Sequence, residues 1–312
     1  MKDLLRTADL SPTDLETLLR LATRFVDAPY DRQTLLAGRT AVLYFAKPST
    51  RTRISTATAV TRLGGTPLTV SGAELQLGRG ETIEDTARVL SAYAGAIVVR
   101  TFADDDVARL AAAASVPVIN ALTDGHHPLQ SLADLLTLRQ LFGELRHRRI
   151  AYVGDGNNVT HSLIEAAALT GLDIAVATPA GYEPDKQIVE DARALAETHG
   201  STIVLTGDPV EAVTGASAVY TDVWVSMGDP EDERAARMKA LAPYRVTAGL
   251  MGRARPDAVF LHCLPAHRGD EVAAEVIDGA RSAVFRQAAN RLPTVQAALC
   301  ALIEGHLTGR SG

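Results

Sequence analysis

The sequence reads Thr40-Ala41-Val42-Leu43-Tyr44-Phe45 and then, after three residues, Ser49-Thr50-Arg51-Thr52-Arg53. The first run is short and mostly apolar, which predicts a buried β-strand. Helical periodicity follows at once, from about Ile54 to Leu63. A strand that leads into a helix through a short polar segment is the repeating unit of a parallel α/β sheet. This stretch therefore indicates the fold class of the chain.

The same alternation of apolar runs and helical patterns recurs along nearly the whole chain. Helical periodicity fills the gaps, for example from Leu15 to Phe25 and from Val189 to Thr198, and Ser11-Pro12 is typical of a capped helix start. The runs that read as strands are Thr40–Phe45, Leu68–Val70, Ala96–Val99, Pro117–Ile119, Ile150–Val153, Ile174–Ala177, Thr202–Leu205, Ala218–Thr221, Val259–Leu261 and Ala283–Phe285.

Ten strands are many for one sheet, so we expect an α/β fold with two doubly wound parallel-sheet domains. The domains are expected at residues 1–143 and 144–290, with the break near Phe142-Gly143-Glu144. The C-terminal helix, in residues 291–312, is expected to return to the first domain and pack there, starting at about Leu292. Binding sites in such sheets form beyond the carboxyl ends of the strands, where the polar motifs of this chain fall.

Composition and charge argue against several classes of protein. Apolar residues make up 46% of the 312 residues and charged residues 22%, which is typical of a globular protein. A net charge of −6 with dispersed basic residues argues against nucleic-acid binding. The longest apolar stretch, Leu110 to Leu122, is shorter than the roughly 20 residues of a membrane span. With two cysteines and no signal-peptide pattern, a cytoplasmic location is expected.

The Ser49–Arg53 segment predicts a phosphate site. A helix start offers free N–H groups and the positive end of the helix dipole. Hydroxyl groups and an arginine fork add donors whose geometry matches phosphate oxygens. The alternative is an ordinary helix cap with solvated arginines. No Walker pattern occurs in the chain, so a nucleoside triphosphate is not implied.

Two further elements follow predicted strands in the same half of the chain. His127-Pro128-Leu129-Gln130 precedes a helical run from Leu132 to Leu141, and its histidine and glutamine can bind a carbonyl and an amide. Arg100 comes directly after the apolar run Ala96–Val99. Alone, each would more simply be loop structure or a surface charge, but together they point to one site.

The second half of the chain carries groups suited to an amino acid. Gly154-Asp155-Gly156-Asn157-Asn158 ends a strand, but Val159 stands where a dinucleotide fingerprint needs its third glycine. A nicotinamide oxidoreductase is therefore disfavoured, and a tight turn with two amides remains. Asp222 follows another strand, and Ser226 adds a hydroxyl, a combination that suits an ammonium group.

His262-Cys263-Leu264-Pro265 follows the run Val259–Leu261 and places a thiol at a strand end. A zinc site is a poor interpretation, because no Cys-x-x-Cys occurs and Cys300 lies in the terminal helix, where it reads as inert core. A thiol near carboxylates and histidines could instead orient or deprotonate an amine.

These motifs resemble those of the carbamoyltransferase family, over essentially the whole chain. Ser-Thr-Arg-Thr at 49–52 and His-Pro-x-Gln at 127–130 are shared by the superfamily. Asp-x-x-x-Ser-Met-Gly at 222–228 and His-Cys-Leu-Pro at 262–265 are typical of its ornithine branch. The resemblance implies transfer of the carbamoyl group of carbamoyl phosphate to the δ-amine of L-ornithine, which gives citrulline in arginine metabolism.

The resemblance also implies roles for single residues. Carbamoyl phosphate would be bound by Ser49, Thr50, Arg51, Thr52, Gln76, Arg100, His127, Gln130 and Arg291. L-Ornithine would be bound by Asn158, Asp222, Ser226, Met227, Cys263 and Leu264. Gln76 would reach the site from the adjacent subunit, since the family forms homotrimers, or multiples of them, with sites at subunit interfaces. The family uses no metal and no organic cofactor.

The chemistry is consistent with these residues. A neutral amine attacks the carbamoyl carbon, and the developing oxyanion needs fixed donors such as Arg100 and His127. An amine that must lose a proton explains the carboxylate of Asp222 and the thiol of Cys263. We therefore expect Arg100, His127, Cys263 and Asp222 to be catalytic.

Two positions depart from the family pattern. Ala57 and Ala289 stand where the family usually has glutamate, and a glutamate at position 57 would lie one helical turn after Arg53. These changes keep two other hypotheses open. One is a related carbamoyltransferase for another amine acceptor, and the other is a weakly active binding or regulatory homologue.

Overall fold

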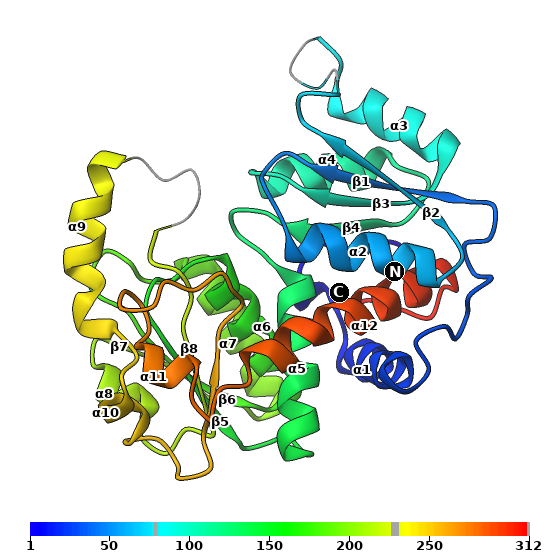
Figure 1. Cartoon of the computed structure of the whole chain (residues 1–312). Helices are drawn as coiled ribbons and strands as arrows, with labels where there is room; N and C mark the ends of the chain where they lie inside the picture. The colour runs from blue at the N-terminus through cyan, green and yellow to red at the C-terminus, as the bar shows by residue number, and fades with distance from the viewer. Residues whose placement is uncertain (76, 78–79, 226–230, 311–312) are drawn as a thin grey trace. The chain divides into compact units, whose positions relative to one another are not determined.

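Two parallel sheets organise the chain, as the alternation of strands and helices predicted (Figure 1). The computed structural model describes residues 1–75, 77, 80–225 and 231–310. By its internal contacts the chain divides into a first unit, residues 1–136 with 289–312, and a second unit, residues 137–288. The domain boundaries expected at residues 143 and 290 stay predictions, because compactness alone does not say which residues fold independently.

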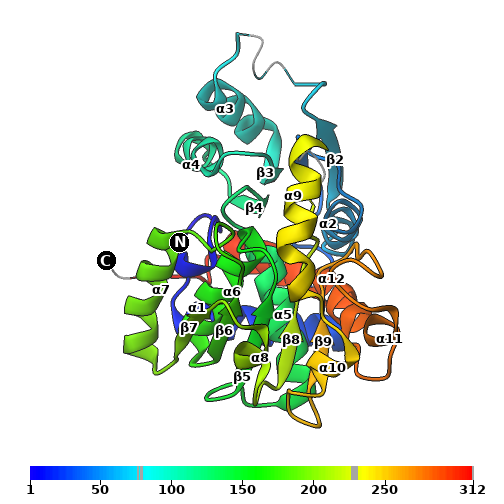
Figure 2. The same cartoon turned by 90° about the vertical axis from the view of Figure 1, so that its left-hand side faces the viewer.

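The sheet of the first unit has the strand order β2-β1-β3-β4, and its pairings are parallel. Figures 1 and 2 show α3 and α4 on one face of this sheet and α2 on the other. Buried Ile97 and Val99 pack with Val107 and Leu110 in the core beneath α3 and α4. The strands are β1 Thr40–Phe45, β2 Thr66–Ser71, β3 Ala94–Arg100 and β4 Val118–Leu122, and the helices are α1 Pro12–Asp27, α2 Arg51–Arg62, α3 Ile83–Tyr93 and α4 Asp104–Ala113, with a 3-10 turn at Thr7–Asp9.

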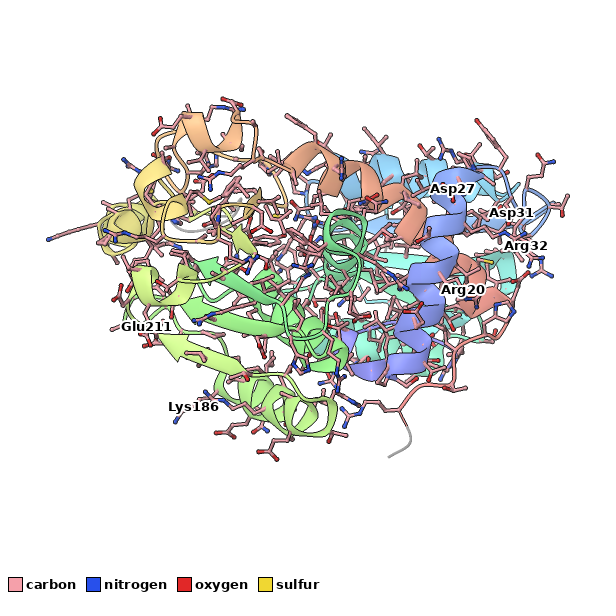
Figure 3. The ribbon with its side chains drawn as sticks, turned by 90° about the horizontal axis from the view of Figure 1, so that it is seen from below. Arg20, Asp27, Asp31, Arg32, Lys186 and Glu211 are labelled. Atoms are coloured by element: carbon pink, nitrogen blue, oxygen red, sulfur yellow. The ribbon has the colours of Figure 1, made fainter. Side chains whose placement is uncertain are left out.

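Helix α1 begins where the sequence predicted. The Ser11 hydroxyl accepts a hydrogen bond from the Asp14 N–H at 3.1 Å, and the Asp14 carboxylate accepts one from the Ser11 N–H at 3.0 Å. This reciprocal capping box satisfies two N–H groups that have no partner inside a helix. Figure 3 shows Arg20 and Asp27 on the same helix, and both side chains are exposed while its apolar side is buried.

The sheet of the second unit has the order β7-β6-β5-β8-β9, again with parallel pairings. Figures 1 and 2 show α6 and α7 on one face and α8 and α10 on the other. In Figure 3, exposed Lys186 marks the start of α7 and exposed Glu211 lies on α8. The strands are β5 Arg149–Val153, β6 Asp173–Ala177, β7 Ile203–Thr206, β8 Ala218–Tyr220 and β9 Val259–Leu261, and the helices are α6 Asn158–Thr170, α7 Lys186–His199, α8 Pro209–Val213, α9 Glu231–Leu241, α10 Ala248–Met251 and α11 Ala274–Ile277, with a 3-10 turn at Ala242–Tyr244.

Helices α5, Pro128–Phe142, and α12, Val284–Ile303, each have residues in both units. The strand expected at Ala283–Phe285 was wrong, because α12 begins at Val284, earlier than the expected Leu292. Only a single bridge, between Phe260 and Ser282, extends the sheet there. Phe285 is 71% exposed, so this apolar run is a helix start and not a buried strand. From Ala289 onward α12 belongs to the first unit, which confirms the expected return of the C-terminal helix.

Each sheet has one place where the strand order reverses. In the first unit this lies between β1 and β3, whose last residues, Phe45 and Arg100, are paired. In the second unit it lies between β5 and β8, where Tyr152 pairs with Tyr220. Loops that leave adjacent strands in opposite directions open a crevice for ligands at such points. The predicted motifs follow these strands.

Within the described part of the chain, no helix combines the length and the apolar character that a bilayer span requires.

Candidate active site

The start of α2 is built to receive an anion. The Thr50 side chain makes no capping hydrogen bond to the first N–H groups of the helix. Those groups carry the positive end of the dipole of a helix of 12 residues. Arg51 is the first helical residue and Thr52 is buried one position later. The predicted phosphate-binding residues thus lie at a helix start that follows a buried strand.

Arg291 is hydrogen-bonded to two other residues of the predicted carbamoyl phosphate set. Its side chain is 2% exposed and donates to the Gln130 amide oxygen at 2.6 Å and to the Thr52 hydroxyl at 2.8 Å. These residues come from α12, α5 and α2, and all lie in the first unit. A buried guanidinium held by a fixed amide and a hydroxyl is a preorganised donor for an oxygen that gains negative charge.

His127 lies just before α5 and is buried. Burial lowers the pKa of its imidazole well below the usual value, and the charges of Arg291, Arg100 and Arg51 lower it further. The ring is therefore neutral near pH 7, so it can donate an N–H without adding a fourth positive charge. The positive charges of Arg100 and Arg51, two residues of the predicted phosphate set, thus act on this histidine.

In the second unit, Asn157 holds the carboxylate of Asp222. Its amide oxygen caps α6 by accepting from Val159 N–H at 3.0 Å, and its amide NH₂ donates to Asp222 Oδ2 at 2.8 Å. The turn before it is tight, because a Cβ at Gly156 would lie 2.2 Å from the Pro184 nitrogen. The sequence analysis assigned ornithine binding to Asn158, the first residue of α6, and missed the contact of Asn157 with Asp222. An asparagine before a helical run was the available signal.

Cys263 and Asp222 meet as the sequence predicted. The Cys263 thiol donates to Asp222 Oδ1 at 2.8 Å, although the two residues are 41 positions apart. Asp222 is buried and Cys263 is partly exposed, so a ligand can reach the sulfur. Beneath them, burial and the charge of Asp222 raise the pKa of the Tyr152 phenol well above its ordinary value. Tyr152 therefore stays neutral and adds no charge to that of Asp222.

His262 shapes the segment that carries the thiol. Its Nδ1 accepts a hydrogen bond from the Leu264 N–H at 2.8 Å, where Leu264 has a φ of +61°. The His262 N–H donates to the Gln287 amide oxygen at 2.9 Å. On the other side, His262 Nε2 lies 3.4 Å from Glu271 Oε1, and both side chains are fully buried. A left-handed backbone conformation is costly for leucine, and the imidazole helps to hold it.

Asp155 is paired with an arginine that the sequence analysis did not name. Arg237, on α9, donates to the Asp155 carboxylate and, through Nε, to the Trp224 carbonyl. Its guanidinium also lies 5.1 Å from the centre of the Tyr182 ring. The negative charge of Asp155 is thus balanced inside the second unit, while Asp222 is held by a neutral amide and a thiol.

A metal ion could be held by the ligand atoms of Asp222, His262 and Cys263, which lie within 4.8 Å of one another. However, His262 Nδ1 already accepts from Leu264, and the Cys263 thiol already donates to Asp222. These bonds organise the group as a hydrogen-bonded set, which favours amine chemistry over metal binding. The expectation that the protein uses no metal and no cofactor stays a prediction.

Several predicted residues lie outside the described part of the chain, namely Gln76, Ser226 and Met227. The remaining ones group by unit as predicted. The carbamoyl phosphate set from Ser49 to Arg291 belongs to the first unit, and Asn158, Asp222, Cys263 and Leu264 belong to the second. Their roles toward the substrates stay predictions.

The two positions that depart from the family pattern lie on helices near the phosphate half. Ala57 is partly buried on α2 and Ala289 is exposed on α12. The pKa of Glu74 is lowered by its hydrogen bonds with Ser71 and also by the charge of Arg53. Arg53 therefore has an acidic neighbour outside α2, even though position 57 is alanine.

Comparison with known families gives matches along both halves of the chain. Residues 2–140 match the carbamoyl-P binding domain of aspartate/ornithine carbamoyltransferase, and residues 146–302 match the Asp/Orn binding domain. Among curated proteins, the chain is 50% identical over 304 residues to an ornithine carbamoyltransferase of Anoxybacillus flavithermus, covering 97% of this chain and 96% of that protein.

Two further relatives agree with these matches. An ornithine carbamoyltransferase of Bacillus subtilis is 49% identical over 302 residues, covering 97% of this chain and 94% of that protein. Among solved structures, the ornithine carbamoyltransferase from Pyrococcus furiosus superimposes with a TM-score of 0.93 at 46% identity, covering 98% of each chain. The likeness thus extends over the whole fold and the whole sequence.

Proposed function

Because the chain belongs to the aspartate/ornithine carbamoyltransferase family, we propose that it transfers the carbamoyl group of carbamoyl phosphate to the δ-amine of L-ornithine. The products are L-citrulline and phosphate, in arginine metabolism. The observation that carries the proposal is the hydrogen bond between the Cys263 thiol and Asp222 at 2.8 Å. A carboxylate and a thiol that meet beyond the ends of the adjacent strands β8 and β9 suit an amine acceptor, which distinguishes this reaction from simple hydrolysis.

In the phosphate half, the residues stabilise the charge that develops on the substrate. Arg51 and the start of α2 bind the phosphate, whose negative charge increases as it leaves. Arg100, neutral His127 and Arg291 face the carbamoyl group and stabilise the oxyanion that forms when the amine attacks. Ser49, Thr50, Thr52 and Gln130 complete the binding set. Holding both substrates in one site supplies much of the remaining rate enhancement.

In the amine half, the residues prepare the nucleophile. A primary alkyl ammonium has a pKa near 10.4, so the δ-amine must lose a proton before it attacks. Asp222 accepts a hydrogen bond from the Cys263 thiol. The sulfur lone pairs then point away from Asp222 and are available to accept hydrogen bonds from the ammonium group. Asn158 and Leu264, with Ser226 and Met227, complete the proposed ornithine set. The site needs no covalent nucleophile.

A citrulline assay tests the proposal. Purified protein is incubated with carbamoyl phosphate and with ornithine, lysine, putrescine or N-acetylornithine, and the carbamoylated product is measured. Ornithine is expected to give the fastest turnover. Faster turnover with another amine would assign the chain to a different acceptor. No turnover with any amine would support the binding or regulatory homologue that Ala57 and Ala289 leave open.

We also propose a homotrimer, or a multiple of it, whose sites are shared between subunits. Among the described residues, the first unit has more exposed large apolar side chains than the second. They are Val26, Tyr30, Ile54, Leu68, Val89, Tyr93 and Phe102, against Leu205, Val210 and Phe285. The first-unit set includes Tyr30, Tyr93 and Phe102, and aromatic residues are enriched at protein interfaces. The proposal places the enzyme in the cytoplasm, with no nucleic-acid or membrane partner.

Subunit mixing tests the shared site. Gln76→Ala and Arg100→Ala are each expected to be nearly inactive. A mixed oligomer can combine an intact Gln76 from one subunit with an intact Arg100 from its neighbour, so mixing should restore part of the activity. A fully active monomer in light scattering would contradict the proposal.

A further inference from the structure

We propose that Asp134 is a positioning residue for carbamoyl phosphate, because it fixes the orientation of the Gln130 amide. Asp134 lies one turn after Gln130 on α5, and both side chains are 1% exposed. The Gln130 amide NH₂ donates to Asp134 Oδ1 at 2.8 Å. The inference rests on the proposed function, since it assigns Gln130 to the carbamoyl group.

The two partners of Gln130 leave it one favourable orientation. A carboxylate only accepts hydrogen bonds and a guanidinium only donates them. With the amide NH₂ toward Asp134, the amide oxygen accepts from Arg291 at 2.6 Å. If the amide rotated by half a turn, an oxygen would face the carboxylate and an NH₂ would face the guanidinium. Both contacts would then be repulsive, so Asp134 and Arg291 together lock the amide.

The locked orientation matters for the substrate. An amide oxygen has two lone pairs, and Arg291 occupies one of them. The other can accept a hydrogen bond from the NH₂ of a carbamoyl group. If the amide were rotated, its NH₂ would face the carbamoyl NH₂. Both groups are hydrogen-bond donors, so the contact would be repulsive. Asp134 therefore governs recognition of the carbamoyl NH₂, a group that inorganic phosphate lacks.

Asp134 also places a negative charge near a buried cation. Arg291 is 2% exposed, and it is linked to Asp134 through the Gln130 amide. A buried charge is costly unless an opposite charge or hydrogen bonds compensate it. The other buried carboxylate among the described residues of the first unit, Asp14, caps α1 and binds the Thr308 and Gly309 N–H groups. Asp14 therefore offers a matched control outside this network.

Calorimetry with two probes tests the inference. Carbamoyl phosphate and inorganic phosphate are titrated into the wild type and into Asp134→Ala, Asp134→Asn and Asp14→Asn. Asp134→Ala should bind carbamoyl phosphate about tenfold more weakly and phosphate nearly as tightly as the wild type does, because one oriented hydrogen bond is lost. Asp134→Asn can turn either its oxygen or its NH₂ toward Gln130, so the loss should be about threefold. Asp14→Asn should leave both affinities unchanged.

The ratio of the two affinities separates positioning from folding. If Asp134→Ala or Asp134→Asn lost both ligands equally, Asp134 would be a structural residue and the inference would be wrong. An unchanged ratio in both variants would also overturn it. Should Asp134→Ala fail to fold, Asp134→Asn alone decides, since its loss must be confined to carbamoyl phosphate. A wild type that neither binds carbamoyl phosphate nor makes citrulline would instead contradict the proposed function.

Discussion

The candidate sites of the two units, which form the half-sites of the proposed reaction, occupy the same place in their sheets but carry opposite charge. Each follows the strands between which the strand order reverses, β1 and β3 in the first unit and β5 and β8 in the second. The first is cationic, with Arg51, Arg100 and Arg291 around a neutral histidine. The second is acidic, with Asp155 and Asp222. The fold thus fixes where a site forms, and the side chains at the strand ends fix which substrate it binds.

The half-sites also differ in how their charges are held. Arg291 is held by neutral partners, a threonine hydroxyl and a glutamine amide. Asp155 is held by a cation, Arg237. Asp222 accepts from the Asn157 amide and the Cys263 thiol, so no cation cancels its charge there. A cationic group whose charge is not cancelled suits a phosphate, and an anionic one suits an ammonium. Substitutions in each half should therefore differ in kind.

Arg51→Ala should have the largest effect, on the phosphate half alone. The loss of charge-assisted hydrogen bonds, worth about 1.5–3 kcal/mol each, should weaken carbamoyl phosphate binding by roughly 10- to 100-fold and also slow phosphate departure. Calorimetry and steady-state kinetics measure the two effects. Arg62→Ala, at the other end of α2, is the control and should change neither. Unchanged carbamoyl phosphate binding would remove Arg51 from the site.

Cys263→Ser should impair the amine half and spare the phosphate half. Ornithine kcat/KM should fall by on the order of tenfold, with an altered pH profile, because a serine hydroxyl is far less acidic than a thiol and takes part in proton transfer less readily. Carbamoyl phosphate binding should be nearly unchanged. The control is Cys300→Ser, since Cys300 is fully buried and burial, with Glu304, raises the pKa of its thiol to about 12. If calorimetry showed Cys263→Ser losing carbamoyl phosphate as badly as Arg51→Ala, the assignment of substrates to the two halves would be wrong.

Asn157→Ala should sharpen the comparison within the second unit. It removes the cap of α6, worth about 1 kcal/mol of stability, and also a hydrogen bond to the Asp222 carboxylate. Ornithine KM should therefore rise several-fold, by about 1 kcal/mol of binding energy. Asp185→Ala removes the cap of the neighbouring helix α7 and should cost similar stability with no change in KM. Equal KM values for the two variants would leave Asn157 with a capping role only.

A pH dependence of stability is expected from His127. Its folded pKa is lowered by burial and then by the charges of Arg291, Arg100 and Arg51. Below the ordinary value of 6.5, the unfolded chain binds a proton that the folded chain does not, so stability falls as the pH decreases. The contribution is at most about 1.4 kcal/mol per pH unit. Denaturant unfolding between pH 8 and 5 should show a shallower slope for His127→Gln, and an identical slope would contradict a depressed pKa.

Much of the fold could be predicted from short-range patterns. Nine of the strands lie where apolar runs predicted them. The inner strands are apolar along their length because both faces of a parallel sheet are covered, whereas the edge strand β2 is largely exposed. The tenth run, Ala283–Phe285, failed because it has no sheet partner beyond one bridge and instead begins α12. A short apolar run does not distinguish a strand from the first turn of a helix.

The missed site residues differ in how far away their signals lie. Asn157 precedes a helical run, and Asp134 lies four positions after Gln130, so both signals were local. Arg237 binds Asp155 from 82 positions away, and no pattern in the sequence joins them. The substrate-binding roles of Gln76 and Met227 rest on family resemblance alone, and that of Ser226 rests also on its hydroxyl, four positions after Asp222.

The sequence by itself determined the alternation of strands and helices and the polar residues that end each strand. These features are local. Backbone geometry sets the spacing at which residues of one helix or strand share a face, so burial and capping leave a pattern over a few positions of the sequence. The tertiary structure alone decided which side chains meet. Arg291 reaches Thr52 across 239 positions, and Cys263 reaches Asp222 across 41. Such pairs depend on how the helices pack and on the order of the strands in the sheets, which sets which strand ends become neighbours.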